Sequence, residues 1–328
     1  MLDFVTASDP DWAGRTQTGP DGGPAMRTLR SPLTAAVIAL VTLGSLAGAA
    51  CSRGGGAPGE TTTIQVKGSD TMVNIAQAWA EEYKRVVPSV NVEVSGGGSG
   101  VGIAALEKGA VDIANASRNL HPEERDQAKR NTGKEPVEFV VGYDALAVYV
   151  NKDNPLEEIS LDALAQVFGE GGTTTRWSQL GVTLPAVSDD TIVRVSRQSS
   201  SGTYEFFREH VLAKHDFKLG SRDMNGSKEV VELVGTTRTA IGYSGMGYAT
   251  PAVKMLRLAA KAGQPAVAPT VENTLSRAYP LARSLQIYTL GEPQGAVKQY
   301  IDWILSDAGE KILQENGYVP VPATLRKR

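Results

Sequence analysis

Hydrophobic and polar positions follow two different periods from residue 61 onward. Residues 61–67 (TTTIQVK) alternate and are rich in β-branched side chains, which predicts a strand. Residues 73–85 place apolar side chains three and four positions apart, as on one face of a helix. Residues 90–94 and 101–108 repeat this order of strand, loop and helix. The alternation predicts an α/β fold with a largely parallel sheet.

The rest of the chain continues the alternation without a repeat of fixed period. Residues 137–150 form a long, mostly apolar run that Gly142, Tyr143 and Asp144 interrupt. Further strands are predicted at residues 111–114, 192–196, 240–243, 256–258 and 285–290, and further helices at 161–168, 203–214, 295–306 and 308–316.

Residues 26–51 have the pattern of an export signal. A basic stretch at residues 26–30 precedes an uncharged, mostly apolar run at 33–50, and Cys51 follows it. This order resembles a bacterial lipobox, in which the cysteine is acylated and becomes the mature N-terminus, although Gly48 stands where the strongest examples carry leucine. A single transmembrane anchor is the alternative.

Each segment before residue 61 therefore has an expected role. Residues 26–50 form a lipoprotein signal peptide, Cys51 carries the lipid, and residues 51–60 are a flexible linker. Residues 1–25 are an extension that is either disordered or upstream of the true start at Met26. We expect a protein outside the cytoplasm, in the periplasm or at the cell surface, held to the membrane by its lipid.

Composition and charge exclude several classes of protein. The chain has 33 Lys and Arg against 36 Asp and Glu, a net charge of −3, so no basic balance points to nucleic acid. Its 41% apolar residues exclude an intrinsically disordered chain. One cysteine excludes an intramolecular disulfide framework and a cysteine-based zinc site, and the three histidines lack metal-ligand spacing. We expect neither a metal nor a cofactor.

Three small, polar loops stand directly before predicted helices. They are Gly68–Thr71 (GSDT), Gly96–Gly100 (GGGSG) and Ser199–Thr203 (SSSGT). A helix N-terminus presents unpaired N–H groups and the positive end of its dipole, so it favours an anion. Arg197 can place a guanidinium beside the third loop. The alternative is that these residues are ordinary helix caps and turns.

Five motifs, in order, carry a resemblance to a known family. They are GSDTM (68–72), GGGSGVGIAAL (96–106), DIANASR (112–118), RQSSSGT (197–203) and IGYSGMGYA (241–249). With YPLARSLQIYT (279–289) and the closing helices, the chain from residue 62 to residue 321 closely resembles the extracytoplasmic phosphate-binding proteins of bacterial phosphate ABC transporters.

The resemblance implies a two-lobed periplasmic-binding-protein fold of type II, with the ligand in the interdomain cleft. The first lobe is expected at residues 61–142 plus 248–328, and the second at 143–247. The implied function is the capture of inorganic phosphate by a monomer that delivers it to an ABC permease. The same fold tuned to sulfate or molybdate, or serving as a phosphate sensor, stays open as an alternative.

The resemblance also implies a set of donors to a tetrahedral oxyanion: Thr71, Met72, Ser99, Arg197, Ser201, Gly202 and Thr203. Ser69, Asp70, Ser117 and Arg118 complete the candidate site. Many relatives end the third motif with an aspartate that accepts the proton of hydrogen phosphate, whereas this chain has Ser117 and Arg118 there. Asp70 is the candidate replacement, with a helix N-cap as its alternative role.

A phosphoester hydrolase is the remote alternative. Such an enzyme needs a nucleophile with a nearby base or a metal cluster, and no histidine or carboxylate cluster accompanies Ser99 or Ser201 in the sequence. Residues 242–246 (GYSGM) fail the G-x-S-x-G pattern at its last position. The sequence therefore predicts a binding protein and not an enzyme.

Overall fold

The computed structural model describes residues 61–326 of the chain. The expectations for the extension, the signal peptide, the lipid on Cys51 and the linker lie outside these residues. Among residues 61–326, none of the helices combines the length and the apolar character needed to cross a bilayer.

A nine-stranded sheet runs through the described chain in the order β2-β1-β3-β11-β4-β8-β6-β7, with β9 also paired to β4. The strands are β1 (Thr62–Gly68), β2 (Val90–Ser95), β3 (Ile113–Ala116), β4 (Pro136–Asn151), β6 (Val193–Arg197), β7 (Arg222–Met224), β8 (Ala240–Gly245), β9 (Val253–Met255) and β11 (Ala282–Leu290). A separate pair joins β5 (Glu158–Ser160) and β10 (Arg257–Ala259).

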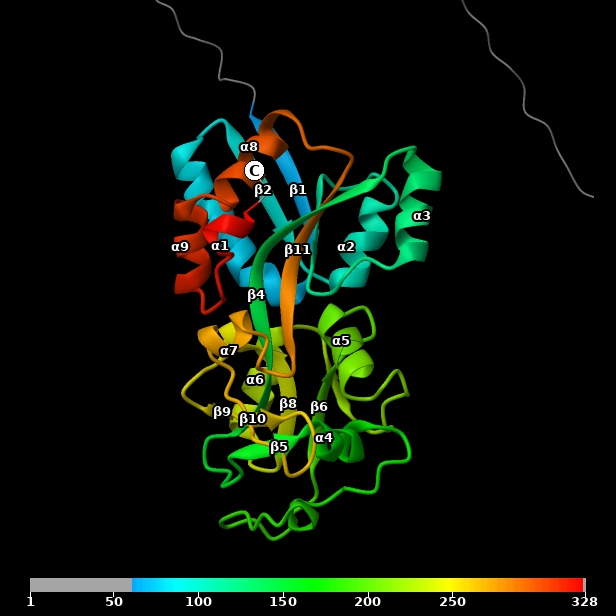
Figure 1. Cartoon of the computed structure of the whole chain (residues 1–328), viewed down its shortest axis with the longest axis vertical. Coiled ribbons are helices and arrows are strands. Elements are labelled where there is room, and N and C mark those ends of the chain that lie inside the picture. Colours follow the sequence, from blue (N-terminus) through cyan, green and yellow to red (C-terminus); the bar gives the residue numbers. More distant parts are fainter. Residues whose placement is uncertain (1–60, 327–328) are drawn as a thin grey trace, which may run out of the picture. The chain divides into compact units, whose positions relative to one another are not determined.

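Strand β4 belongs to two groups of strands. Its first part pairs antiparallel with β11, from Pro136 to Ala145, and its second part pairs with β8, from Leu146 to Val150. We call β1, β2, β3, β11 and the first part of β4 the first strand group, and the second part of β4 with β6, β7, β8 and β9 the second strand group. Figure 1 shows β4 and β11 side by side between them. The apolar run at 137–150 is thus one continuous strand.

The other strands of each group pair parallel, whereas every pair that includes β4, β9 or β11 is antiparallel. Strand β1 pairs parallel with β2 and β3, and β6 pairs parallel with β7 and β8. The sheet is therefore mixed, because the two strands that connect the groups run against their neighbours. The carboxyl ends of β1, β2 and β6 lead into the three polar loops that the sequence predicts.

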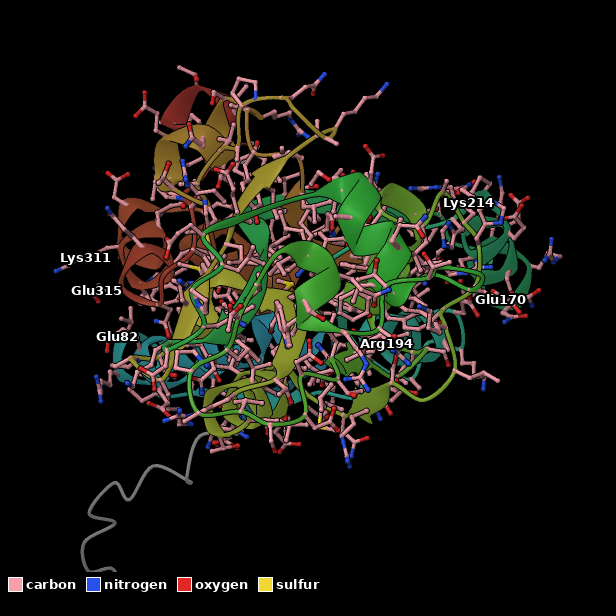
Figure 2. The ribbon with its side chains drawn as sticks, turned by 90° about the horizontal axis from the view of Figure 1, so that it is seen from below. Glu82, Glu170, Arg194, Lys214, Lys311 and Glu315 are labelled. Atoms are coloured by element: carbon pink, nitrogen blue, oxygen red, sulfur yellow. The ribbon has the colours of Figure 1, made fainter. Side chains whose placement is uncertain are left out.

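Nine α-helices pack on the sheet of the described chain: α1 (Val73–Val86), α2 (Ser99–Leu106), α3 (Pro122–Thr132), α4 (Leu161–Phe168), α5 (Gly202–His210), α6 (Ser227–Thr236), α7 (Val271–Leu275), α8 (Gly295–Ile304) and α9 (Asp307–Glu315). The predicted face of α1 is buried, and the Trp79 indole N–H donates to Gly309 O at 2.8 Å. Figure 2 shows Glu82 of α1 near Lys311 and Glu315 of α9, all at the surface.

Residues 253–281 pack with the second strand group. Strand β9 pairs with the far end of β4, at Tyr149 to Asn151. Leu258, Tyr279 and Leu281 belong to the apolar cluster that surrounds α4 and α5. The sequence analysis placed residues 248–328 in the first lobe, but the chain rejoins the first strand group only at β11. Pairing with β4 therefore keeps this segment with the second strand group.

Candidate functional site

The three polar loops follow β1, β2 and β6, and they meet beside Ser117 at the end of β3. Ser69 Oγ donates to Ser117 Oγ at 2.9 Å, and the Ser117 N–H donates to Ser99 Oγ at 3.1 Å. The hydroxyl oxygens of Thr71 and Thr203 lie 2.9 Å apart. We call the following residues the hydroxyl cluster: Ser69, Thr71, Ser99, Ser117, Ser201 and Thr203. All six are buried, with 2% or less of their surface exposed.

Two glycines allow the loops of the two strand groups to touch. A Cβ on Gly202 would lie 2.3 Å from Ser99 Oγ and 2.9 Å from Ser117 Oγ. A Cβ on Gly98 would lie 2.4 Å from Ser200 O, and its φ of 99° also favours glycine. The Gly100 N–H donates to Ser200 O at 3.0 Å, which ties the start of α2 to the third loop. The glycines of these loops are thus needed for close approach.

Several hydroxyls of the cluster already accept a hydrogen bond from an N–H group. Ser201 Oγ caps α5 by accepting from the N–H groups of Thr203 and Tyr204, at 3.2 and 3.4 Å. Ser99 Oγ accepts from the Ser117 N–H, and Thr71 Oγ1 accepts from Arg283 at 3.2 Å. A hydroxyl that already accepts keeps its own proton to donate. Beside the N-termini of α2 and α5, this arrangement favours an anion.

Arg197 is buried at the edge of the cluster and is fixed by four bonds. Its Nη2 donates to Asp70 Oδ2 at 2.7 Å and to Asn225 O at 2.9 Å. Its Nη1 donates to Ser227 Oγ at 3.1 Å, and its Nε donates to Met224 O at 3.3 Å. Burial lowers the pKa of the Arg197 guanidinium, although the charge of Asp70 acts in the opposite direction. The guanidinium is a rigid cation supplied by the second strand group.

Asp70 connects the first two loops to Arg197. Its Oδ1 accepts from the Gly97 N–H at 2.8 Å, while its Oδ2 accepts from Arg197. Ser69 occupies the N-cap position of the short 3-10 turn η1 (Asp70–Met72). The Asp70 side chain therefore bonds across loops and not to its own turn.

Two of the candidate residues have other partners. The Met72 N–H donates to Ser69 O at 3.0 Å and closes η1, while its side chain lies in the apolar core. Arg118 donates to both oxygens of Glu124, at 2.8 and 2.7 Å, and its Nε lies 2.6 Å from Glu205 Oε2. The structure thus brings together Ser69, Asp70, Thr71, Ser99, Ser117, Arg197, Ser201, Gly202 and Thr203. It places Arg118 on the flank of this site.

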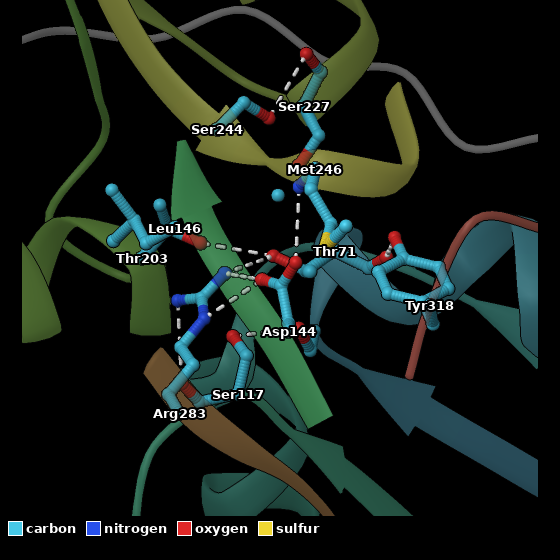
Figure 3. Close-up of polar contacts among 12 residues, drawn as sticks. Thr71, Ser117, Asp144, Leu146, Thr203, Ser227, Ser244, Met246, Arg283 and Tyr318 are labelled. Carbon is cyan, nitrogen blue, oxygen red and sulfur yellow. Dashed lines mark hydrogen bonds and ion pairs between the residues drawn. The ribbon is translucent and has the colours of Figure 1, made fainter. Parts of the chain in front are cut away.

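Sequence analysis missed a second buried arginine, Arg283 of β11 (Figure 3). Its Nη2 donates to Asp144 Oδ2 at 2.7 Å and to Thr71 Oγ1, and its Nη1 donates to Ser117 O at 3.3 Å. Asp144 also accepts from the Met246 N–H at 3.0 Å. Burial raises the pKa of Asp144, and Arg283 opposes this effect. The sequence did carry a signal for this pair. Asp144 and Arg283 each lie within a mostly apolar strand, where a buried charge needs a partner of opposite charge.

The site therefore contains two arginine–aspartate pairs, Arg197 with Asp70 and Arg283 with Asp144. Within residues 61–326, no cluster of three or more His, Cys, Asp or Glu could hold a metal ion. The chemistry available at the site is hydrogen-bond donation from hydroxyls, backbone N–H groups and two guanidinium groups.

Comparisons with known proteins agree with this geometry. Residues 55–308 match the family model of the PBP superfamily domain. The phosphate-binding protein PstS of Pseudomonas aeruginosa is 33% identical over 282 residues, which cover 83% of this chain and 87% of the relative. This chain belongs to the PstS family. The family resemblance and the periplasmic-binding-protein fold expected from the sequence are thereby confirmed.

Solved structures described as phosphate ABC transport proteins have the same fold. One, from Clostridium perfringens, is described as a phosphate ABC transporter substrate-binding protein with bound phosphate; it is 28% identical, with a TM-score of 0.70 over 80% of this chain and 100% of that one. An ABC-type phosphate transport receptor from Vibrio cholerae is 29% identical, with a TM-score of 0.62 over 79% of this chain and 100% of that one.

Proposed function

We propose that this protein captures inorganic phosphate outside the cytoplasm and delivers it to the permease of an ABC transporter. The observation that carries the proposal is the hydroxyl cluster, in which donors from both strand groups meet beside Arg197. A buried oxyanion needs several such donors, since an ion without partners would not leave water. Proteins of the same family, named for phosphate, support this choice of anion.

Each contributor to the proposed site has a distinct role. Thr71, Ser99 and Ser117 donate from the first strand group, and Ser201, Gly202 and Thr203 donate from the start of α5 in the second. Arg197 supplies the charge-assisted bonds, which contribute more than bonds between neutral groups. We retain Asp70 as the acceptor for the proton of hydrogen phosphate, because each carboxylate oxygen has a second lone pair beside those used by Gly97 and Arg197.

The proposal describes binding without catalysis. The cluster's hydroxyls are held by N–H donors and arginines, and the carboxylates of Asp70 and Asp144 are each paired with an arginine. A serine nucleophile needs a base to take its proton. Delivery to a permease, a lipid anchor on Cys51 and a monomeric state complete the proposal, and they depend on the family and on the N-terminal sequence.

Isothermal titration of the purified exported protein with phosphate, arsenate, sulfate and molybdate tests this function. We expect tight binding of phosphate and arsenate, which keep a proton near neutral pH, and far weaker binding of sulfate and molybdate. Preference for sulfate or molybdate would instead assign the fold to another oxyanion. Absence of heat with all four anions would refute the proposal.

A further inference from the structure

An ion-pair network joins the two strand groups on the flank of the hydroxyl cluster. Arg118 and His121 follow β3 of the first strand group, and Glu205 lies in the first turn of α5, which follows β6 of the second. The Arg118 Nε lies 2.6 Å from Glu205 Oε2, and His121 Nε2 lies 2.5 Å from Glu205 Oε1. One carboxylate thus contacts two basic side chains across the groups.

Arg118 is held in place independently of Glu205. Its side chain is 6% exposed and forms a bidentate ion pair with Glu124 of α3. Burial would lower the pKa of Arg118, but the hydrogen bond and charge of Glu124, with the charge of Glu205, raise it. Removal of the Glu205 charge therefore leaves Arg118 paired within its own strand group. Neutralisation of Glu205 therefore weakens the contact between the two strand groups without leaving the buried Arg118 charge unpaired.

The position of Glu205 couples this link to the anion site. Glu205 stands two residues after Thr203 and three after Gly202, in the same short helix. A helix moves as a unit, so a contact that holds Glu205 against the first strand group also holds the N-terminus of α5 against Ser99 and Ser117. The link therefore resists withdrawal of the donors that α5 supplies.

We propose that Glu205 is a positioning residue that holds α5 against Arg118 and His121 and so slows the release of bound phosphate. The inference rests on the proposed function, because it concerns the same site. It gives Arg118 the role of an anchor for α5 in place of the ligand contact expected from the sequence. The partly exposed carboxylate, 29% by side chain, suits a contact that forms and breaks as the site closes and opens.

The test compares Glu205→Gln with Glu209→Gln in stopped-flow and calorimetric measurements of phosphate binding. Glutamine keeps the shape of the side chain and removes its charge. Glu209 is the matched control, because it lies on the same helix and its partner Lys214, 3.8 Å away, lies four residues beyond the end of α5 in the same strand group. We expect Glu205→Gln to raise the dissociation rate constant by about three- to tenfold, with the association rate constant changed by less than about twofold. The control should match the parent protein.

A second pair of variants separates positioning from general stability. His121→Gln and the double variant with Glu205→Gln should show coupling, since removal of the histidine has less effect once the carboxylate is neutral. The melting temperature of the ligand-free protein should be unchanged in Glu205→Gln. Any one of three results would overturn this inference and leave the proposed function standing. Phosphate release could be unchanged in Glu205→Gln, or Glu205→Gln and Glu209→Gln could have equal effects. The melting temperature of Glu205→Gln could also fall enough to account for its loss of affinity. Failure of the parent protein to bind phosphate would overturn the proposed function as well.

Discussion

Substitution of Gly202 by alanine should abolish tight phosphate binding while the protein stays folded. The added Cβ would lie 2.3 Å from Ser99 Oγ, whereas ordinary contacts of a Cβ begin near 3.4 Å. Unless Ser99 turns its hydroxyl out of the cluster, which itself removes a donor, the first turn of α5 must withdraw by about 1.1 Å, the difference between these distances. A shift of that size takes donors of α5 beyond hydrogen-bonding reach of an anion held by Ser99 and Ser117.

The expected loss follows from the number of donors that are displaced. A hydrogen bond to a charged group contributes about 1.5–3 kcal/mol. Loss of two such bonds corresponds to at least ~3 kcal/mol, or roughly a hundredfold higher Kd. The fold should tolerate the change, because Gly202 begins a helix without a positive φ and alanine is the better helix former.

Isothermal titration and thermal melting of the ligand-free protein measure these two effects separately. Gly295→Ala is the matched control: Gly295 also begins a helix, has a φ of 55° and has nothing within 4 Å of an added Cβ. The control should melt at a lower temperature and bind phosphate like the parent. An affinity of Gly202→Ala within about threefold of the parent would refute the close approach of α5 to Ser99.

Three further predictions concern charged groups. Asp70→Asn should lower the ratio of phosphate to sulfate affinity by more than about tenfold, because the variant loses the charge that repels sulfate. If calorimetry shows an unchanged ratio, Asp70 does not accept the phosphate proton and serves only to hold Arg197. Arg283→Gln should destabilise the fold by about 3–5 kcal/mol in chemical denaturation, because Asp144 stays buried without its partner, and the double variant with Asp144→Asn should recover most of that loss. Burial raises the pKa of Glu310 from 4.5 to about 7, so the folded state binds the proton of this carboxyl more tightly than the unfolded state does. The free energy of unfolding should therefore fall as pH rises from 4.5 to about 7. Glu310→Gln should flatten the pH profile of the melting temperature in that range while still accepting from the Val321 N–H, and an unchanged profile would show that Glu310 does not titrate there.

The sequence predicted the parts of the site that depend on local patterns. A glycine- and serine-rich loop before a helix is readable from a few residues, and all three such loops lie at the hydroxyl cluster. Arg197 was found for the same reason, because it stands four residues before the cap residue Ser201. Strand and helix positions also followed from period, as in α1, whose predicted face packs in the core.

Features that depend on pairing between distant segments were not predictable from the pattern. The partner of Arg118 on α5 and the pairing of Arg283 with Asp144 join residues far apart in the chain, and no local spacing encodes them. The pairing of β9 with β4 is likewise not encoded by local spacing. Strand β9 is too short to be assigned to a strand group from its sequence, and only its pairing with the far end of β4 places it in the second strand group.

The position of bound phosphate is the most direct test of the central claim. A crystal structure of the protein grown with phosphate should show the anion within hydrogen-bonding distance of Thr71, Ser99, Ser201 and Arg197. Density for phosphate away from these four residues would contradict the account, for example in the 330 Å³ cavity lined by His121, His210 and Arg277.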